Sequence, residues 1–259
     1  MSDLLNSSNC QTKSEKTIVI SQSMYFPWVG MLEQIRLADS YVYYDDVQFS
    51  HGVSNNRINR IQVKTEQGQK WMTIPIRDFH FGQKIDEVLI DDRKDWRNQH
   101  RQILQQAYKG APFKNEMLEL VDRVFSKSFT TLADVARAST MELAEYFDIV
   151  EGKMFVDSKT MNIGGSSDKR VLDIVLALGG NIYVTGLGAR NYMDFEMFNT
   201  AGVQVRFMQY RCIPYPQLHG EFTPYVTGLD LVANCGKEGK PYIQSEAIDW
   251  KDFLRINHE

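Results

Sequence analysis

The chain has 259 residues, of which 43% are hydrophobic and 24% are charged, and its formal net charge is −4 at pH 7. This length and composition are ordinary for a globular protein of one large domain or two tightly packed ones. The negative charge argues against a general nucleic-acid binder or a protein that binds acidic membranes, because both need a basic surface. It leaves room for a local basic pocket that holds a phosphate.

The three cysteines, Cys10, Cys212 and Cys235, are far apart in the sequence. None has the spacing of metal ligands, so the sequence favours neither a disulfide framework nor a metal site. No apolar run is long enough to span a bilayer, and residues 1–16 lack the order of a signal peptide. We therefore expect a cytoplasmic protein with no membrane span, in which residues 1–16 form a disordered tail.

The stretch 17–49 predicts a strand, a tight turn, a helix and a second strand. Residues 17–21 are a β-branched apolar run, residues 31–38 have helical spacing, and residues 41–44 are a short second strand. Ligands of open α/β sheets bind outside the carboxyl ends of the strands, so we expect the floor of a site here. The residues expected to form it are Gln22, Tyr25, Trp28, Asp45, Asp46 and Gln48.

Two runs with β character, 60–65 and 70–76, are joined by a loop that contains Gly68 and predict a hairpin. The loop before the hairpin carries Asn56 and Arg57, and a guanidinium group suits a carboxylate or a phosphate. A solvated loop with ordinary ion pairs is the alternative interpretation. The loop after the hairpin holds His80 between two phenylalanines, as either a catalytic or a structural histidine.

Three helices are predicted between residues 91 and 148. The first covers 91–108, begins at an aspartate that can cap it, and has His100 on its apolar stripe. The second covers about 113–125, and the third extends from about 132 to 147. We interpret their apolar stripes as core and His100 as a half-buried structural histidine. The expected organisation is a single α/β domain over 17–259 with a helical subdomain at about 91–148.

The second half of the chain predicts helix, strand, glycine-rich turn and helix. The helix over 169–178 can be capped by Ser166, Ser167 or Asp168, and its free amides also favour an anion. The strand over 181–184 is followed by Thr185, Gly186, Leu187, Gly188 and Ala189. The two glycines let a ligand approach the backbone. The turn matches neither the Walker A loop nor the full dinucleotide fingerprint.

A short helix over 190–198 and a strand over 203–208 are predicted next. The proline-rich segment 211–228 predicts an ordered irregular loop, which carries Tyr215, Gln217 and His219. Residues 229–233 are interpreted as a last apolar turn and residues 236–259 as a mostly polar tail. The alternation of strands and helices predicts an α/β fold: a mostly parallel sheet with flanking helices, a β-hairpin and a three-helix insertion.

Three strings of this sequence resemble the WbqC-like family of bacterial proteins. They are QSMYFPWVGMLEQIRLADSYVYYDDVQF at 22–49, IYVTGLGARNYMD at 182–194 and YPQLHGEFTPYVTGLDLVAN at 215–234. Members of this family are commonly found among genes for O-antigen and other surface polysaccharides. The resemblance therefore implies lipopolysaccharide biosynthesis as the pathway and leaves the reaction open.

When the family's recurrent residues are placed on this sequence by position, most of them fall on the polar residues named above. One further position falls on Tyr192. Many members resemble IHQPNYLPW where this chain has residues 20–28, so Ser21 stands where they have a histidine. That departure puts in doubt any mechanism through the histidine. The aromatic residue that usually precedes the Asn-Arg motif is also missing. A second resemblance, in fold only, is to the nucleotidylyltransferases of the HIGH superfamily, whose His-x-Gly-His turn is replaced here by residues 27–30.

Three functions are compatible with these features. The first is an enzyme that acts on a nucleotide-linked amino sugar, most simply by transferring an acyl or aminoacyl group from an acyl-thioester donor (coenzyme A or a carrier protein). The second is nucleotidyl transfer, in which carboxylates hold Mg²⁺ against a nucleotide. The third is a non-enzymatic protein of the same pathway that binds a nucleotide sugar. The oligomeric state is open, with a homodimer as one candidate.

The expected roles follow from the chemistry of acyl transfer, which needs a base near the amine and a partner for the developing oxyanion. Asp45 or Asp46 could orient or deprotonate the amine, and His80 or His219 could be the base. The binding candidates are Gln22, Tyr25, Trp28, Gln48, Asn56, Arg57, Ser166, Ser167, Asp168, Thr185, Gly186, Gly188, Tyr192, Tyr215 and Gln217.

Overall fold

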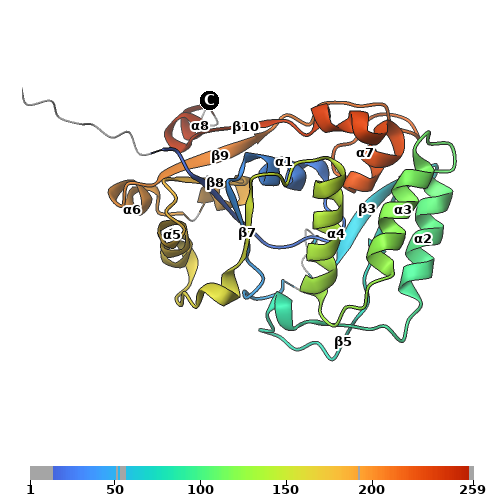
Figure 1. Ribbon diagram of the computed structural model, residues 1–259, viewed down its shortest axis with the longest axis horizontal. Coiled ribbons are helices and arrows are strands. Elements are labelled where there is room, and N and C mark those ends of the chain that lie inside the picture. The colour runs from blue at the N-terminus through green and yellow to red at the C-terminus, as the bar shows by residue number, and fades with distance from the viewer. Residues whose placement is uncertain (1–13, 51, 53–56, 192, 257–259) are drawn as a thin grey trace, which may run out of the picture.

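The computed structural model describes residues 14–50, 52, 57–191 and 193–256 (Figure 1). A six-stranded sheet has the order β10-β9-β8-β1-β2-β7. Its strands are β1 (Thr17–Ser21), β2 (Ser40–Tyr43), β7 (Met154–Asp157), β8 (Ile182–Thr185), β9 (Gln204–Tyr210) and β10 (Ser245–Asp249). All neighbouring strands pair in parallel except β10, which is antiparallel to β9. The predicted α/β fold with a mostly parallel sheet is confirmed.

Helices cover both faces of the sheet. They are α1 (Val29–Leu37), α2 (Trp96–Ala107), α3 (Lys114–Phe125), α4 (Leu132–Tyr146), α5 (Ser167–Ala177), α6 (Phe195–Thr200), α7 (Gly228–Cys235) and α8 (Trp250–Ile256). One buried cluster joins Val19 and Tyr41 of the sheet to α1, α3, α4 and α7, and a second joins Ile18 and Val42 to α5, α6 and α8. Neighbouring residues of β1 thus face opposite layers, as in a parallel sheet that is buried on both sides.

The chain reverses its direction of travel across the sheet between β1 and β8. It passes from β1 through α1 to β2, and later returns from β7 through α5 to β8 on the other side of β1. Helices α1 and α5 belong to opposite layers. Such a reversal leaves a switch point outside the carboxyl ends of the two central strands, where open α/β sheets bind ligands.

A β-hairpin and a second short strand pair lie next to the three helices α2, α3 and α4, which Figure 1 shows side by side beside the sheet. The predicted hairpin is confirmed as β3 (Arg60–Thr65) and β4 (Gly68–Thr73). A second short pair is β5 (Ile76–Arg77) with β6 (Leu89–Ile90). Short 3-10 turns are η1 (Ile85–Glu87), η2 (Ser158–Met161), η3 (Leu187–Asn191) and η4 (Gly236–Tyr242).

The interpretation of residues 236–259 as a polar tail is wrong for the part that is described. These residues form η4, β10 and α8, and β10 pairs with β9 from Ser245–Tyr210 to Asp249–Arg206. An edge strand needs apolar side chains on one face only, so its sequence can be mostly polar. Such a sequence does not show the apolar pattern from which strands are predicted. On α8, Phe253 stacks on Phe207 with ring centroids 4.3 Å apart. Residues 1–13 of the other predicted tail lie outside the described residues.

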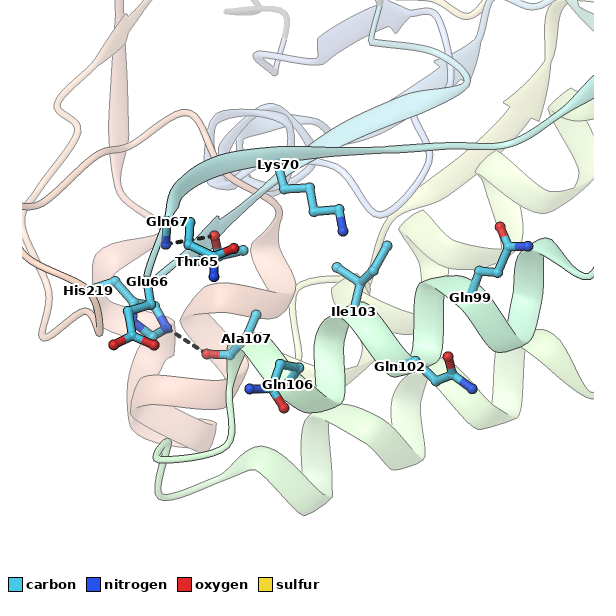
Figure 2. Close-up of a pocket in the computed structure, with 10 residues that line it drawn as sticks. All are labelled: Thr65, Glu66, Gln67, Lys70, Gln99, Gln102, Ile103, Gln106, Ala107 and His219. Carbon is cyan, nitrogen blue, oxygen red and sulfur yellow. Dashed lines mark hydrogen bonds between the residues drawn. The ribbon is translucent and has the colours of Figure 1, made fainter.

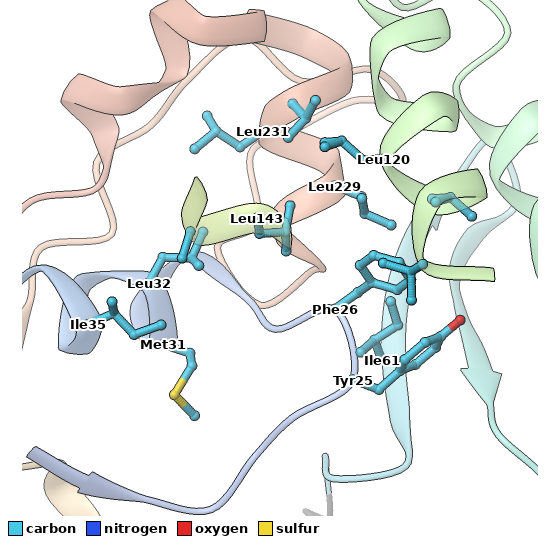
Figure 3. Close-up of a cluster of buried hydrophobic side chains, with 14 of the residues drawn as sticks. Tyr25, Phe26, Met31, Leu32, Ile35, Ile61, Leu120, Leu143, Leu229 and Leu231 are labelled. Atoms are coloured by element: carbon cyan, nitrogen blue, oxygen red, sulfur yellow. The ribbon is translucent and has the colours of Figure 1, made fainter. Parts of the chain in front are cut away.

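The turn after β1 enters the core of the helical layer. Tyr25 and Phe26 are fully buried, and Figure 3 shows them close to Ile61 and Leu229. The backbone amide of Phe26 donates to the hydroxyl of Ser139 on α4 (2.9 Å). Residues 25–26 therefore anchor the turn under the helices, while the residues on either side of them face the carboxyl edge of the sheet.

His100 is buried beside Tyr25, with its Nδ1 atom 3.0 Å from the tyrosine hydroxyl. Burial lowers the pKa of His100 from 6.5 to about 4, against the effect of a hydrogen bond with the Thr73 backbone. In the unfolded chain His100 binds a proton as the pH falls through about 6.5, whereas in the folded chain it does so only near pH 4. The stability that neutral His100 contributes is complete above pH 6.5 and is lost as the pH falls toward 4.

We expect His100→Gln to reduce the loss of stability between pH 7 and pH 5. The histidine accounts for about 2 kcal/mol of that loss in the wild-type protein. Urea unfolding at the two pH values measures it. His80→Gln, which changes an exposed histidine, is the control and should lose as much free energy of unfolding between the two pH values as the wild-type protein. An equal loss in wild type and His100→Gln would contradict the assignment.

None of the helices in the described part of the chain has the length and apolar character needed to cross a membrane.

Candidate functional site

Asp45 is completely buried where β2 ends. Its carboxylate accepts hydrogen bonds from the amide and hydroxyl of Ser23 (2.8 and 2.7 Å) and pairs with Nε of Arg137 on α4 (2.6 Å). Arg137 also pairs with Asp157 at the end of β7 (2.5 Å). Burial raises the pKa of Asp45, and the bonds from Ser23 and Arg137 oppose this rise. Asp45 ties α4 to the sheet, and its role as a catalytic group stays a prediction.

Asp46 faces the other layer of the molecule. It accepts a hydrogen bond from the hydroxyl of Ser158 (2.5 Å) and forms an ion pair with Arg170 of α5. Although burial opposes the shift, the hydrogen bonds from Arg170 and Ser158 lower the pKa of Asp46. Arg170 also donates to the carbonyl of Ile163 (2.9 Å), so it is held from two sides. Asp46 joins β2 to α5, and its catalytic role also stays a prediction.

These two aspartates do not fit a magnesium ion. Each carboxylate is already bonded to a guanidinium group, which would repel a divalent cation. Within residues 14–256, apart from the positions left undescribed, no three His, Cys, Asp or Glu side chains are grouped so that they could hold a metal ion.

The start of α5 lies near the start of α6. Asp168 is buried, and its carboxylate accepts hydrogen bonds from the amide of Asp194 (2.7 Å) and the hydroxyl of Ser167 (3.3 Å). Ser166 and Ser167 are exposed. Of this predicted group, only the two serines are accessible to a ligand.

The turn after β8 lies at the switch point. Thr185 is buried, and Gly188 is exposed with open space around it. A Cβ atom on Gly186 would come within 3.4 Å of Gln34 on α1 and of the Tyr210 hydroxyl at the end of β9. Gln34 in turn donates to that hydroxyl (3.0 Å). The glycine turn, the start of α1 and the end of β9 therefore meet at one place. Tyr192, predicted nearby, lies outside the described residues.

Trp28 lies where three hollows meet at this edge of the sheet. Its ring contacts Tyr210 and Tyr225, with centroids 4.7 and 5.7 Å apart. The largest hollow has a volume of about 740 Å³ and is lined by these three rings, Leu187 and Arg190, among others. Trp28 is the predicted binding residue that the structure places most clearly beside a pocket.

A second hollow beside Trp28 is bordered by Arg57 and Arg60. Their guanidinium groups lie over the ring of Trp71, with Cζ atoms 5.7 and 4.5 Å from its centroid. Arg57 also donates to the carbonyl of Tyr225 (3.4 Å). Burial and the neighbouring charge of Arg60 lower the pKa of Arg57. Two cations beside aromatic rings suit an anion such as phosphate. Asn56, predicted beside Arg57, lies outside the described residues.

Tyr215 and Gln217 hold the irregular loop together. The hydroxyl of Tyr215 donates to buried Asp230 (2.8 Å), and Gln217 donates to that hydroxyl (3.1 Å). Lys64 of the hairpin donates to the side-chain oxygen of Gln217 (3.1 Å). The ring of Tyr215 also lines the third hollow beside Trp28.

The two candidate histidines lie away from Trp28. His219 donates from Nε2 to the carbonyl of Ala107 at the end of α2 (2.7 Å). Figure 2 shows it at one end of a pocket of about 470 Å³ between the tip of the hairpin and α2. His80 is exposed in the loop before η1. In the same region, exposed Gln48 forms an isolated backbone β-bridge with Lys84.

Gln22 and Tyr25 complete the predicted set. Gln22 is half-buried just beyond β1 and has no side-chain hydrogen bond within the described residues. The ring of Tyr25 packs against Phe26, Trp96 and His100, so the structure places it in the core.

The sequence analysis missed several residues that define this edge. Arg137 and Arg170 hold the two aspartates, and nothing in the helical patterns marks them. Arg190 and Tyr225 lie inside the strings that resemble the family, so the resemblance could have pointed to both. Glu33 lines the third hollow and follows Trp28 by five positions, within α1.

Comparisons with known proteins support the resemblance. The family model described as "WbqC-like protein family" matches residues 22–242. The chain is 30% identical over 232 residues to "Uncharacterized protein Rv1507c" of Mycobacterium tuberculosis, covering 88% of this chain and 98% of that protein. No solved structure matches, so the resemblance in fold to the HIGH superfamily stays a prediction. The chain belongs to the WbqC-like protein family.

Proposed function

We propose that this protein is an enzyme that transfers an acyl or aminoacyl group to a nucleotide-linked amino sugar, and that it binds this sugar around Trp28. The observation that carries the proposal is the pocket of about 740 Å³ at the ends of β8 and β9, lined by aromatic rings and by Arg190. Its volume is within the range of small-molecule sites, and its position is where open parallel sheets bind ligands.

The lining matches the parts of a nucleotide-linked sugar. The rings of Trp28 and Tyr225 offer faces for a base or for the apolar side of a sugar. Arginine forks bind phosphate oxygens with two parallel hydrogen bonds, and Arg57 and Arg190 border the hollows on two sides of Trp28. The glycines after β8 let a diphosphate approach the backbone amides.

In acyl transfer from a thioester, the amine nitrogen attacks the carbonyl carbon and a C–N bond forms. The C–S bond breaks, and a nitrogen proton moves to the departing sulfur.

The family resemblance supports O-antigen or another surface polysaccharide as the pathway and the bacterial cytoplasm as the place. A monomer and a homodimer are both compatible with the site, because all of the residues named come from one chain.

Nucleotidyl transfer through Asp45 and Asp46 is less favoured, because neither carboxylate is free to meet a cation. A protein that binds a nucleotide sugar without turning it over is the remaining alternative. It would show the binding described below and release no thiol from an acyl-thioester.

We expect Arg190→Gln to weaken the binding of UDP-glucosamine and of UDP by about tenfold or more, because a charge-assisted hydrogen bond contributes about 1.5–3 kcal/mol. Titration calorimetry and ligand-induced shifts in melting temperature measure the effect. The control is Arg206→Gln on the same strand as Tyr210, at the end paired with Asp249 and away from the pocket. No stabilisation of the wild-type protein by any UDP-linked sugar, or equal affinity in Arg190→Gln, would contradict the proposal.

A further inference from the structure

Glu33 is a buried carboxylic acid whose side chain is not fully bonded. It lies on α1, and only 2% of the residue is exposed. Its Oε2 atom has no hydrogen-bond partner within the described residues. A buried polar atom without a partner is costly, so it needs either a functional reason or a bound partner.

Glu33 lines the third hollow beside Trp28. This hollow has a volume of about 10 Å³, which is room for about one water-sized group. Aromatic rings line it, and Tyr215 contacts Phe222 and Tyr242 with centroids 5.1 and 5.7 Å apart. The hydroxyl of Tyr215 is occupied by Asp230, so the ring is what this residue presents to the hollow.

An acidic oxygen among aromatic rings is the environment that an ammonium group prefers. The cation is attracted to the faces of Trp and Tyr rings and pairs with the carboxylate. An ammonium group is also about the size of the water molecule that the hollow can hold. A phosphate or a carboxylate would be repelled once Glu33 is ionised, and an apolar group would leave Oε2 without a partner.

We propose that this hollow is the amine subsite of the enzyme, and that Glu33 binds the amino group of the sugar and accepts a proton from it. This inference rests on the proposed function and identifies the part of the substrate that reacts. Trp28 and Cys212 line both this hollow and the pocket of about 740 Å³. An amine held on Glu33 can therefore belong to a ligand whose larger part fills that pocket.

The proton balance of the step is complete. Glu33 takes one proton from the ammonium group, and the free amine then attacks the carbonyl carbon of the acyl-thioester. The C–N bond forms as the C–S bond breaks, and the second nitrogen proton moves to the departing sulfur. Glu33 keeps this proton when the product leaves and releases it to solvent when the next ammonium group binds.

The electrostatics of the hollow suit this role. Burial raises the pKa of Glu33 from 4.5 to about 8, and the charge of Arg36 opposes that rise. A base with a pKa near the working pH is the most effective. Tyr210, Tyr215 and Cys212 also face this region, and burial raises the pKa of each, so they stay neutral where Glu33 titrates.

The sign of the pH dependence follows. Below pH 8 the free protein carries a proton on Glu33, and this proton must leave when the carboxylate pairs with an ammonium ion. Affinity for an amine should therefore rise about tenfold from pH 6 to pH 7, with about one proton released per ligand bound.

The experiment uses glucosamine and N-acetylglucosamine as probes for the full-length protein. We expect glucosamine to bind at pH 7 at least tenfold more tightly than N-acetylglucosamine, with the pH slope just given. Glu33→Gln keeps the shape of the side chain and should lose both the preference and the slope. Glu246→Gln, which changes an exposed glutamate paired with Arg211, is the control and should retain both. Calorimetry in buffers of different ionisation enthalpy counts the protons.

Two results would overturn the subsite. One is a wild-type protein that does not distinguish the two sugars, and the other is an unchanged preference in Glu33→Gln. Carbon NMR of the glutamate carboxyl groups gives a second measurement that needs no variant. The titration midpoint of Glu33, near pH 8 in the free protein, should shift to lower pH when glucosamine is bound. The probes carry no nucleotide, so binding of glucosamine without binding of UDP-linked sugars would contradict the proposed function and leave the amine subsite standing.

Discussion

Replacing Asp45 with alanine is expected to lower the free energy of unfolding by about 3–5 kcal/mol, because it leaves a buried ion pair without one partner. The carboxylate is fully enclosed and pairs with Arg137 at 2.6 Å. Its loss would also leave the amide and hydroxyl of Ser23 without an acceptor. Urea unfolding at pH 7, followed by circular dichroism, measures the change.

Asp157→Ala is the matched control, because Asp157 pairs with the same arginine through a side chain that is 27% exposed. A partly exposed pair contributes at most about 1 kcal/mol. The double variant Asp45→Ala with Arg137→Met should recover part of the loss, since it removes the unpaired charge as well. If Asp45→Ala is as mild as Asp157→Ala, the network does not hold α4 to the sheet.

The strands and helices of the central sheet could be predicted because their apolar patterns are local. The run at 17–21 is β-branched and buried on both sides, and α2 to α4 have stripes at helical spacing. Residues 245–249 could not be predicted in this way. They read as polar because β10 is an edge strand whose only strand neighbour is β9, and a polar strand is stable there only through that pairing.

Residues of the candidate site are also hard to predict where their surroundings come from distant parts of the chain. The sequence predicts Trp28 as a site residue because it follows the first strand, and that rule depends only on sheet topology. From the sequence alone, a glutamate at position 33 of a short helix would be placed in solvent. It is buried because α1 packs against β10 and the irregular loop, both of which come from the far end of the chain. The sequence marks Asp45 and Asp46 as candidate catalytic carboxylates. It does not reveal that each is paired, because their partners, Arg137 and Arg170, are about 90 and 120 residues away.

The site around Trp28 depends on the absence of a side chain at Gly30. A Cβ atom there would lie closer than 3.0 Å to the rings of both Trp28 and Tyr210. Gly30→Ala must therefore push at least one ring out of place, because no real Cβ atom tolerates such a distance. The atoms that have to move are the far ends of side chains, and alanine favours a helix by about 0.5–1 kcal/mol over glycine. The helix should survive while the ring pair does not.

We therefore expect Gly30→Ala to weaken binding of UDP-glucosamine about tenfold or more while its free energy of unfolding stays within about 1 kcal/mol of wild type. The near-ultraviolet circular dichroism of the aromatic rings should change at the same time. Gly164→Ala is the control, because a Cβ atom at Gly164 meets nothing within 4 Å. It should match the wild-type protein in affinity and in spectrum. Wild-type affinity in Gly30→Ala together with a changed aromatic spectrum would show that the rings move and the ligand does not rest on them, which would place the nucleotide-linked sugar elsewhere on the molecule.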